Sequence, residues 1–163
     1  MNVSKRWGDD EYARARGLAQ RYLRYGVRST EELRAHLRDR GVGQRIIEPV
    51  LVVCTQRGLL DDRACARLWA VRLADRGYAA AAIRERLLAK GLNVTQLPSI
   101  SASLQTASDA DRAQLLVRDR LRRGARRDPR LRHRLARLLA QRGFDPDLID
   151  QILNESLGSP SDL

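Results

Sequence analysis

The side chains best suited to catalysis are few in this sequence, and they are not grouped. The two histidines, His36 and His133, lie far apart in arginine-rich stretches without a patterned acid or nucleophile beside them, so we expect surface or core-edge positions. The adjacent carboxylates Asp61 and Asp62 stand where a helix should begin, and capping explains them more simply than metal binding. The nucleotide-binding, serine-hydrolase and zinc-protease motifs are absent. We therefore predict a non-enzyme with no cofactor and no metal.

The two cysteines also argue against redox or metal chemistry. Cys54 and Cys65 lie in apolar helical surroundings without CxxC or CxxH spacing, which favours small core side chains and a reducing compartment. The longest apolar runs, 50–54 and 79–83, are too short to span a bilayer, and the N-terminal residues lack the apolar core of a signal peptide. The sequence predicts a soluble, cytoplasmic protein that binds no membrane and no small-molecule substrate.

The charge of the chain points to an anionic partner. The formal net charge is +11 and the pI is near 11.0, which favours nucleic acid. The charge is concentrated, because residues 112–142 hold twelve arginines against Asp119 and Asp128. A solvated helix face is the alternative for any such run. The predicted contact residues for phosphates or for an acidic protein face are Arg118, Arg122, Arg123, Arg126, Arg127, Arg130, Arg132, Arg134 and Arg137. Secondary candidates are Arg72, Arg76, Arg84, Arg86 and Lys90.

The elements that would carry these arginines are helices. Aromatic residues make up only 4% of the chain, Leu, Ala, Arg and Glu dominate, and proline is scarce. Glycines at Gly41, Gly91 and Gly143 recur at roughly 50 residues, the scale of helical repeat arrays, and each follows an apolar pair at the same spacing. The pattern predicts an all-α fold of three tandem three-helix repeats, stacked into an elongated, curved right-angled or solenoid-like array.

The repeat pattern also sets the expected boundaries. A loose lead-in covers residues 1–12, the three repeats cover 13–57, 58–107 and 108–157, and a flexible tail covers 158–163. A capping box at Ser29 to Glu32 should open the second helix. Pro49 should bend or delay the third helix. The stretch 92–100 should be the third helix of the second repeat, weakened by Pro98.

Four motifs in this order resemble the RecX family of bacterial regulatory proteins over about residues 13–155. They are Ser29 to Leu33 with Arg28 beside it, GLLDD at Gly58 to Asp62, GYAAAAIRERLLAKG at Gly77 to Gly91, and RGFDPDLI at Arg142 to Ile149. The residues that carry the signature are Ser29, Glu32, Leu33, Gly41, Asp61, Asp62, Gly77, Tyr78, Ile83, Leu87, Gly91, Gly143 and Phe144. Family members usually have Gly-Pro where this chain has Ala79 and Ala80, and more basic residues nearby. This departure moves the expected charged contacts toward the third repeat.

The resemblance implies three tandem three-helix repeats and a specific partner, the RecA recombinase as a filament on single-stranded DNA. It implies that the protein restrains ATP hydrolysis and strand exchange by lying in the filament groove, and so modulates recombination and the SOS response to DNA damage. The basic third repeat leaves an alternative open, in which a helical-repeat protein binds single- or double-stranded DNA directly without RecA.

Overall fold

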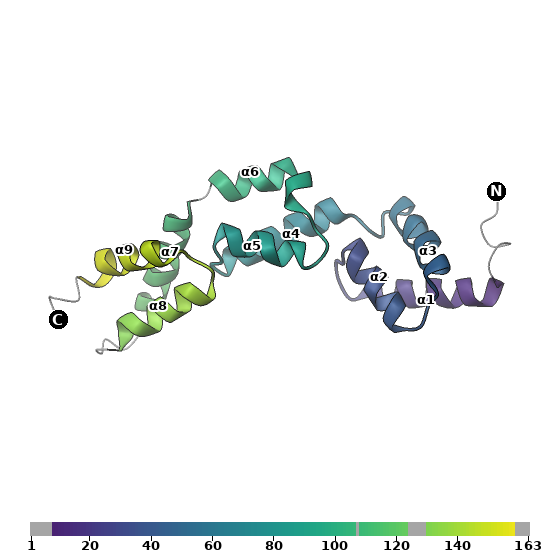
Figure 1. The fold of residues 1–163 in the computed structure, drawn as a ribbon, viewed down its shortest axis with the longest axis horizontal. Helices are drawn as coiled ribbons and strands as arrows, with labels where there is room; N and C mark the ends of the chain where they lie inside the picture. Colours follow the sequence, from purple (N-terminus) through teal and green to yellow (C-terminus); the bar gives the residue numbers. More distant parts are fainter. Residues whose placement is uncertain (1–7, 107, 124–129, 159–163) are drawn as a thin grey trace. The chain divides into compact units, whose positions relative to one another are not determined.

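The structure is a computed structural model that describes residues 8–106, 108–123 and 130–158 (Figure 1). This part of the chain contains nine α-helices, one short 3₁₀ helix and no strand, which confirms the all-α prediction. The helices are α1 (Asp9–Arg24), α2 (Thr30–Asp39), α3 (Gln44–Gln56), α4 (Asp62–Asp75), α5 (Ala80–Leu88), η2 (Val94–Gln96), α6 (Pro98–Thr106), α7 (Asp109–Arg122), α8 (Leu131–Gln141) and α9 (Pro146–Leu157).

Two of the predicted helix starts are confirmed. Ser29 and Glu32 form the full capping box: the Ser29 hydroxyl accepts the Glu32 N–H at 3.1 Å, and the Glu32 carboxylate accepts the Ser29 N–H at 3.0 Å. At the start of α4, the Asp61 carboxylate accepts the backbone N–H of Ala64 at 2.9 Å. Both contacts satisfy donors that a helix leaves without an internal partner in its first turn.

The structure excludes the delayed helix start that Pro49 allowed, so a bend there stays the prediction, and it contradicts a single helix over 92–100. Helix α3 begins at Gln44 and runs through Pro49, so its start is not delayed. The stretch 92–100 is not one helix, because η2 is followed by Leu97 and α6 then begins at Pro98. Proline suits the first position of a helix, where no backbone N–H is needed and its fixed φ is already helical. Pro98 therefore starts the helix that it was expected to weaken.

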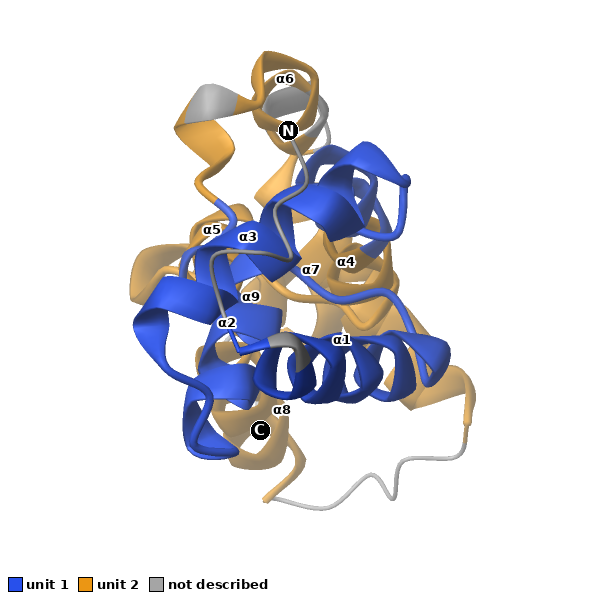
Figure 2. Cartoon of the chain, turned by 90° about the vertical axis from the view of Figure 1, so that its right-hand side faces the viewer, with its two compact units in different colours: residues 1–68, 88–92 blue, residues 69–87, 93–163 orange. Residues whose placement is uncertain are grey.

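The chain divides into two compact units, which Figure 2 colours separately. Unit 1 comprises residues 1–68 and 88–92, and unit 2 comprises residues 69–87 and 93–163. The division falls inside the second predicted repeat, so the units do not coincide with the repeats. The repeat boundaries given above stay a prediction.

The core of unit 1 lies among α1, α2 and α3, which pack against one another. Leu33, Leu37 and Ile47 are completely buried there. Cys54 and Cys65 are buried free thiols, as predicted. Burial, with the nearby carboxylates, raises the pKa of Cys65 to about 11, so the thiolate required for redox or metal chemistry is disfavoured.

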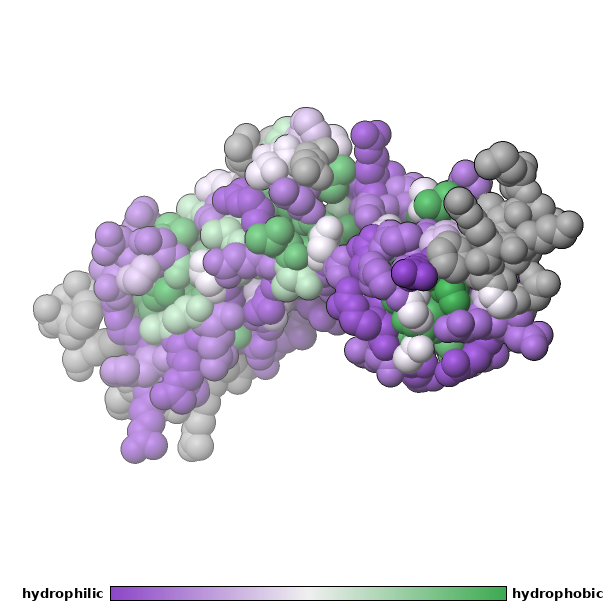
Figure 3. Space-filling model, turned by 45° about the vertical axis from the view of Figure 1, so that its right-hand side comes forward, coloured by the Kyte–Doolittle hydropathy of each residue, from purple (hydrophilic) through white to green (hydrophobic). Residues whose placement is uncertain are grey.

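The core of unit 2 lies between α7, α8 and α9, where α9 packs against both other helices. Val117, Leu139, Ile152 and Leu153 are completely buried there. On the face of the molecule drawn in Figure 3, hydrophilic residues predominate and hydrophobic ones form smaller patches. Among the described residues, no helix is both long and apolar enough to cross a membrane.

Candidate functional site

The repeated glycines mark corresponding places in the chain. Gly41, Gly91 and Gly143 all have a positive φ, between 74° and 81°, just after the second helix of each predicted repeat. Gly41 has open space around it, whereas Gly91 and Gly143 lie against the first turn of the second helix of the preceding repeat. These two close approaches are the centres of two similar contacts between successive repeats.

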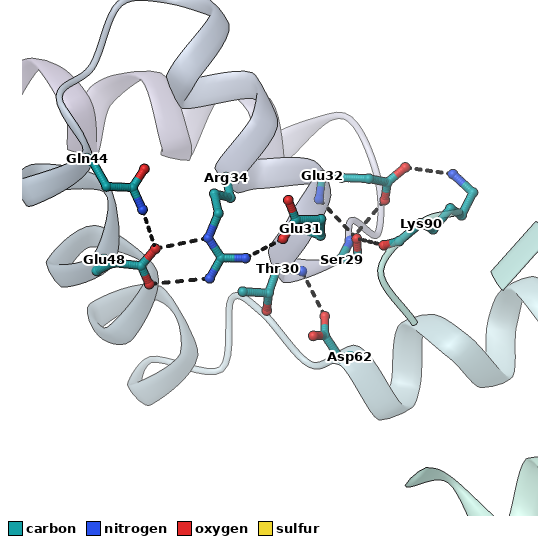
Figure 4. A network of polar contacts seen from close by, with 9 residues as sticks. All are labelled: Ser29, Thr30, Glu31, Glu32, Arg34, Gln44, Glu48, Asp62 and Lys90. Carbon is teal, nitrogen blue, oxygen red and sulfur yellow. Dashed lines mark hydrogen bonds and ion pairs between the residues drawn. The ribbon is translucent and has the colours of Figure 1, made fainter. Parts of the chain in front are cut away.

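We call the first contact joint 1, formed by Ser29 to Glu32 against Asp62, Lys90 and Gly91. Figure 4 shows its polar side chains. The Ser29 hydroxyl donates to the Lys90 carbonyl at 2.5 Å, and the Thr30 N–H donates to the Asp62 carboxylate at 2.8 Å. Ser29 is 1% exposed and is the one buried polar residue in the described part of the chain. The signature residues Ser29, Asp62 and Gly91 therefore hold repeats together.

The charges of joint 1 are matched to one another. The Lys90 ammonium contacts the Glu32 carboxylate at 2.6 Å, and both side chains are mostly shielded from solvent. Beside them, Arg34 bridges Glu31 and Glu48 (Figure 4). Burial raises the pKa of Glu32, but the hydrogen bonds from Lys90 and from the Ser29 N–H outweigh this effect and bring the pKa below its ordinary value.

Acid should weaken unit 1 through these carboxylates. The pKa values of Glu32 and Glu48 both lie below the ordinary 4.5, so below that pH the unfolded chain binds more protons than the folded one. The stabilisation is therefore present above about pH 4.5 and is lost as the pH falls through the folded values. Urea unfolding at pH 7, 5 and 3.5 should show this loss. A Glu32→Gln/Glu48→Gln variant should show a smaller one, and an identical pH dependence in both proteins would contradict the assignment.

The second contact, joint 2, lies in unit 2 and joins corresponding parts of the chain. The Ala79 N–H donates to the Arg142 carbonyl at 3.0 Å, and the Ala80 N–H donates to the Asp109 carboxylate at 2.9 Å. A Cβ atom on Gly143 would lie 2.6 Å from the Cβ of Ala82. Joint 2 thus uses a glycine, a carbonyl and an aspartate at the positions that joint 1 uses.

An aromatic ring adjoins joint 2. The guanidinium carbons of Arg86 and Arg142 each lie over the Tyr78 ring, 4.4 Å from its centre. From sequence alone, Tyr78 and Arg86 have separate predicted roles, and Arg142 is not among the predicted contact residues. One signal could have found it, because a basic residue directly precedes each repeat glycine, at Arg40, Lys90 and Arg142.

The structure places the predicted contact residues in three groups. Those with exposed side chains are Arg72, Arg76, Arg84, Arg86, Arg118, Arg122, Arg123, Arg130, Arg134 and Arg137. Lys90 is engaged in joint 1, and Arg132 donates to the Asn154 side chain at 2.7 Å and to the Gly158 carbonyl at 3.3 Å. Arg126 and Arg127 lie outside the described residues. The role of each in partner binding stays a prediction.

Three of the exposed arginines lie together on one side of α8. Arg130, Arg134 and Arg137 follow the spacing that places residues on the same helix face, and we call them the α8 stripe. They line a surface hollow of about 510 Å³ together with His133, Leu138 and Gln141. His36, by contrast, is partly buried and stacks on Tyr22 with ring centres 4.1 Å apart. Neither histidine has the partners that a catalytic base requires among the residues described.

Sequence relatives decide the family. The "Regulatory protein RecX" of Mycobacterium avium is 32% identical over 148 residues, which cover 89% of this chain and 86% of the relative. The protein of the same name from Mycobacterium leprae is 33% identical, and the match covers 92% of this chain and 90% of the relative. That from Thermobifida fusca is 34% identical, and the match covers 91% of this chain and 82% of the relative. The chain belongs to the RecX family. A RecX family model described as the third three-helix domain matches residues 107–153, which overlap the predicted third repeat.

Solved RecX structures share the fold. The crystal structure of RecX from Lactobacillus salivarius matches with a TM-score of 0.64 at 18% identity, covering 90% of this chain and 97% of that one. A second crystal structure of regulatory protein RecX gives a TM-score of 0.65 at 22% identity, and the match covers 90% of this chain and 73% of that one. The RecX relatives are named as regulators rather than enzymes, in agreement with the sparse catalytic residues of this chain.

Proposed function

We propose that this RecX-family chain binds the RecA recombinase, assembled as a filament on single-stranded DNA, and restrains its ATP hydrolysis and strand exchange without catalysing a reaction itself. The observation that carries the proposal is family membership over about nine tenths of the chain. A regulator of this kind works in the cytoplasm and modulates recombination and the response to DNA damage.

The two joints support a mechanism based on occupancy. Both place the first turn of one predicted repeat's second helix against the next through hydrogen bonds that each use a backbone group, and none of these bonds uses an arginine side chain. Exposed residues outside the joints then supply the contacts. In this proposal the repeats at 13–57, 58–107 and 108–157 lie along the filament groove and touch successive RecA protomers, which obstructs DNA entry and filament growth.

The α8 stripe supplies the charge for this contact. A filament that contains DNA is strongly anionic, and a basic surface is attracted to it over several ångströms at physiological salt. The same stripe favours the second candidate function, direct binding to single- or double-stranded DNA without RecA, because phosphates are the usual ligands of clustered arginines.

Co-sedimentation separates these two functions. The chain is mixed with single-stranded DNA alone, or with RecA filaments formed on that DNA with a slowly hydrolysed ATP analogue, near physiological salt. We expect the chain to pellet with filaments and to remain largely in the supernatant with naked DNA. Equal pelleting with both would support the direct DNA-binding function, and no pelleting with either would contradict both.

A further inference from the structure

The basic residue before the repeat glycine is neutralised by a carboxylate in joint 1 but not in joint 2. In joint 1, the basic residue before the repeat glycine is Lys90, and Glu32 holds it at 2.6 Å. In joint 2 the corresponding basic residue is Arg142, and Ala82 occupies the position that corresponds to Glu32. The first turn of α5 contains no acidic side chain at all. Arg142 consequently receives no carboxylate from the first turn of α5.

Arg142 instead shares an aromatic ring with a second cation, Arg86. Its guanidinium carbon and that of Arg86 are both 4.4 Å from the centre of the Tyr78 ring, so the two charges cannot be separated by more than twice that distance. Within the described residues, neither arginine forms an ion pair. Asp109, the carboxylate of joint 2, is itself paired with Arg112.

This arrangement is suited to an anion. The ring attracts each guanidinium and restricts its movement, so less side-chain entropy is lost when a ligand binds. The two cations repel each other until an anion approaches them both. Arg86 is exposed and the other two side chains are partly buried, so a ligand can reach the cluster from solvent. Guanidinium groups make paired hydrogen bonds with phosphate and carboxylate oxygens.

We propose that Arg86, Tyr78 and Arg142 form a site for the phosphodiester backbone of a nucleic acid, with Tyr78 as the residue that positions the two arginines. A nucleic acid is favoured over an acidic protein segment because the chain as a whole carries +11 and the α8 stripe adds further cations in the same unit. Contacts to the backbone do not read bases, so binding is independent of sequence and depends on salt. The site goes beyond the proposed regulation of RecA, since its test needs no RecA.

The test is fluorescence anisotropy with a labelled thirty-nucleotide single strand of dT, measured over a salt series. The Arg86→Gln/Arg142→Gln variant should bind about tenfold more weakly at low salt, and the magnitude of its log–log salt slope should fall by about 0.7 for each phosphate that the variant no longer neutralises. The matched control is Arg63→Gln/Arg67→Gln, which removes the same charge from exposed positions on α4. This control should retain most of the affinity and nearly the full slope.

Single substitutions test whether weaker DNA binding arises from the site itself and not from a loss of folding. Arg86→Gln changes only an exposed side chain and should weaken binding alone, with an unchanged melting temperature. Tyr78→Phe preserves the ring and should bind like the parent, whereas Tyr78→Leu should bind more weakly. The proposal is overturned if both double variants bind the strand equally weakly, or if the parent chain does not bind the strand. It is also overturned if the Arg86→Gln/Arg142→Gln variant binds DNA normally but no longer binds a polyglutamate peptide, because the site would then take an acidic protein segment.

Discussion

Replacing Gly143 with alanine is expected to lower the free energy of unfolding of unit 2 by about 2 to 4 kcal/mol. The backbone there has a φ of +81°, a conformation that costs an L-residue about 1 to 2 kcal/mol. The new Cβ would also lie 2.6 Å from the Cβ of Ala82, which is attached to the backbone and cannot rotate away. Unfolding in urea, followed by circular dichroism, measures the change.

Gly41 provides the control for this substitution. It has nearly the same φ, +75°, but no atom lies within 4 Å of the position that a Cβ would take. The Gly41→Ala variant should therefore show only the backbone cost of about 1 to 2 kcal/mol. If the two variants were destabilised equally, Gly143 would not be packed against Ala82 and joint 2 would not be a specific contact.

Reversing two charges of the α8 stripe is expected to have the largest effect on function. The Arg134→Glu/Arg137→Glu variant should bind RecA filaments at least about tenfold more weakly, because each contact changes from attraction to repulsion toward an anionic surface. Both side chains are exposed, so the melting temperature should change little. Co-sedimentation over a range of protein concentrations gives the affinity, and circular dichroism checks the fold.

Arg63→Glu/Arg67→Glu is the matched control for the stripe. It alters the net charge by the same amount at exposed positions on α4, which are outside the arginine-rich residues 112–142 of the sequence. Long-range attraction alone would make the two variants equally weak, whereas a specific contact surface on α8 makes the stripe variant much weaker. Full binding by the stripe variant would show that α8 does not face the filament.

Much of the fold could be predicted because the relevant signals are local in sequence. The capping box at Ser29 and the glycines that end the second helices depend on residues within one helical turn, and the structure contains both. The position of Pro98 was harder to interpret, since a proline is favourable at a helix start and costly inside a helix. Sequence spacing alone does not distinguish these two positions, and the structure has Pro98 at the first position of α6.

The joints could not be predicted, because they connect residues far apart in the chain. The hydrogen bond from Ser29 to the Lys90 carbonyl uses a backbone acceptor, and backbone groups leave no sequence pattern. The Arg86, Tyr78 and Arg142 cluster likewise combines two repeats. Charge alone indicates Lys90 and Arg132 as contact residues, yet each also has a partner inside its own unit. The sequence shows how many basic side chains could bind an anion. Their burial and their pairing in the fold decide which of them can reach a partner.

In the function that we propose, the chain restrains RecA. The most direct test is the steady-state rate of ATP hydrolysis by RecA filaments on single-stranded DNA, titrated with the chain at a fixed RecA concentration and repeated with excess single-stranded DNA added. We predict that the rate falls with dose and levels off at or below one chain per RecA protomer, and that the excess DNA does not restore it. An unchanged rate at saturating chain, or inhibition that disappears with excess DNA, would contradict the account.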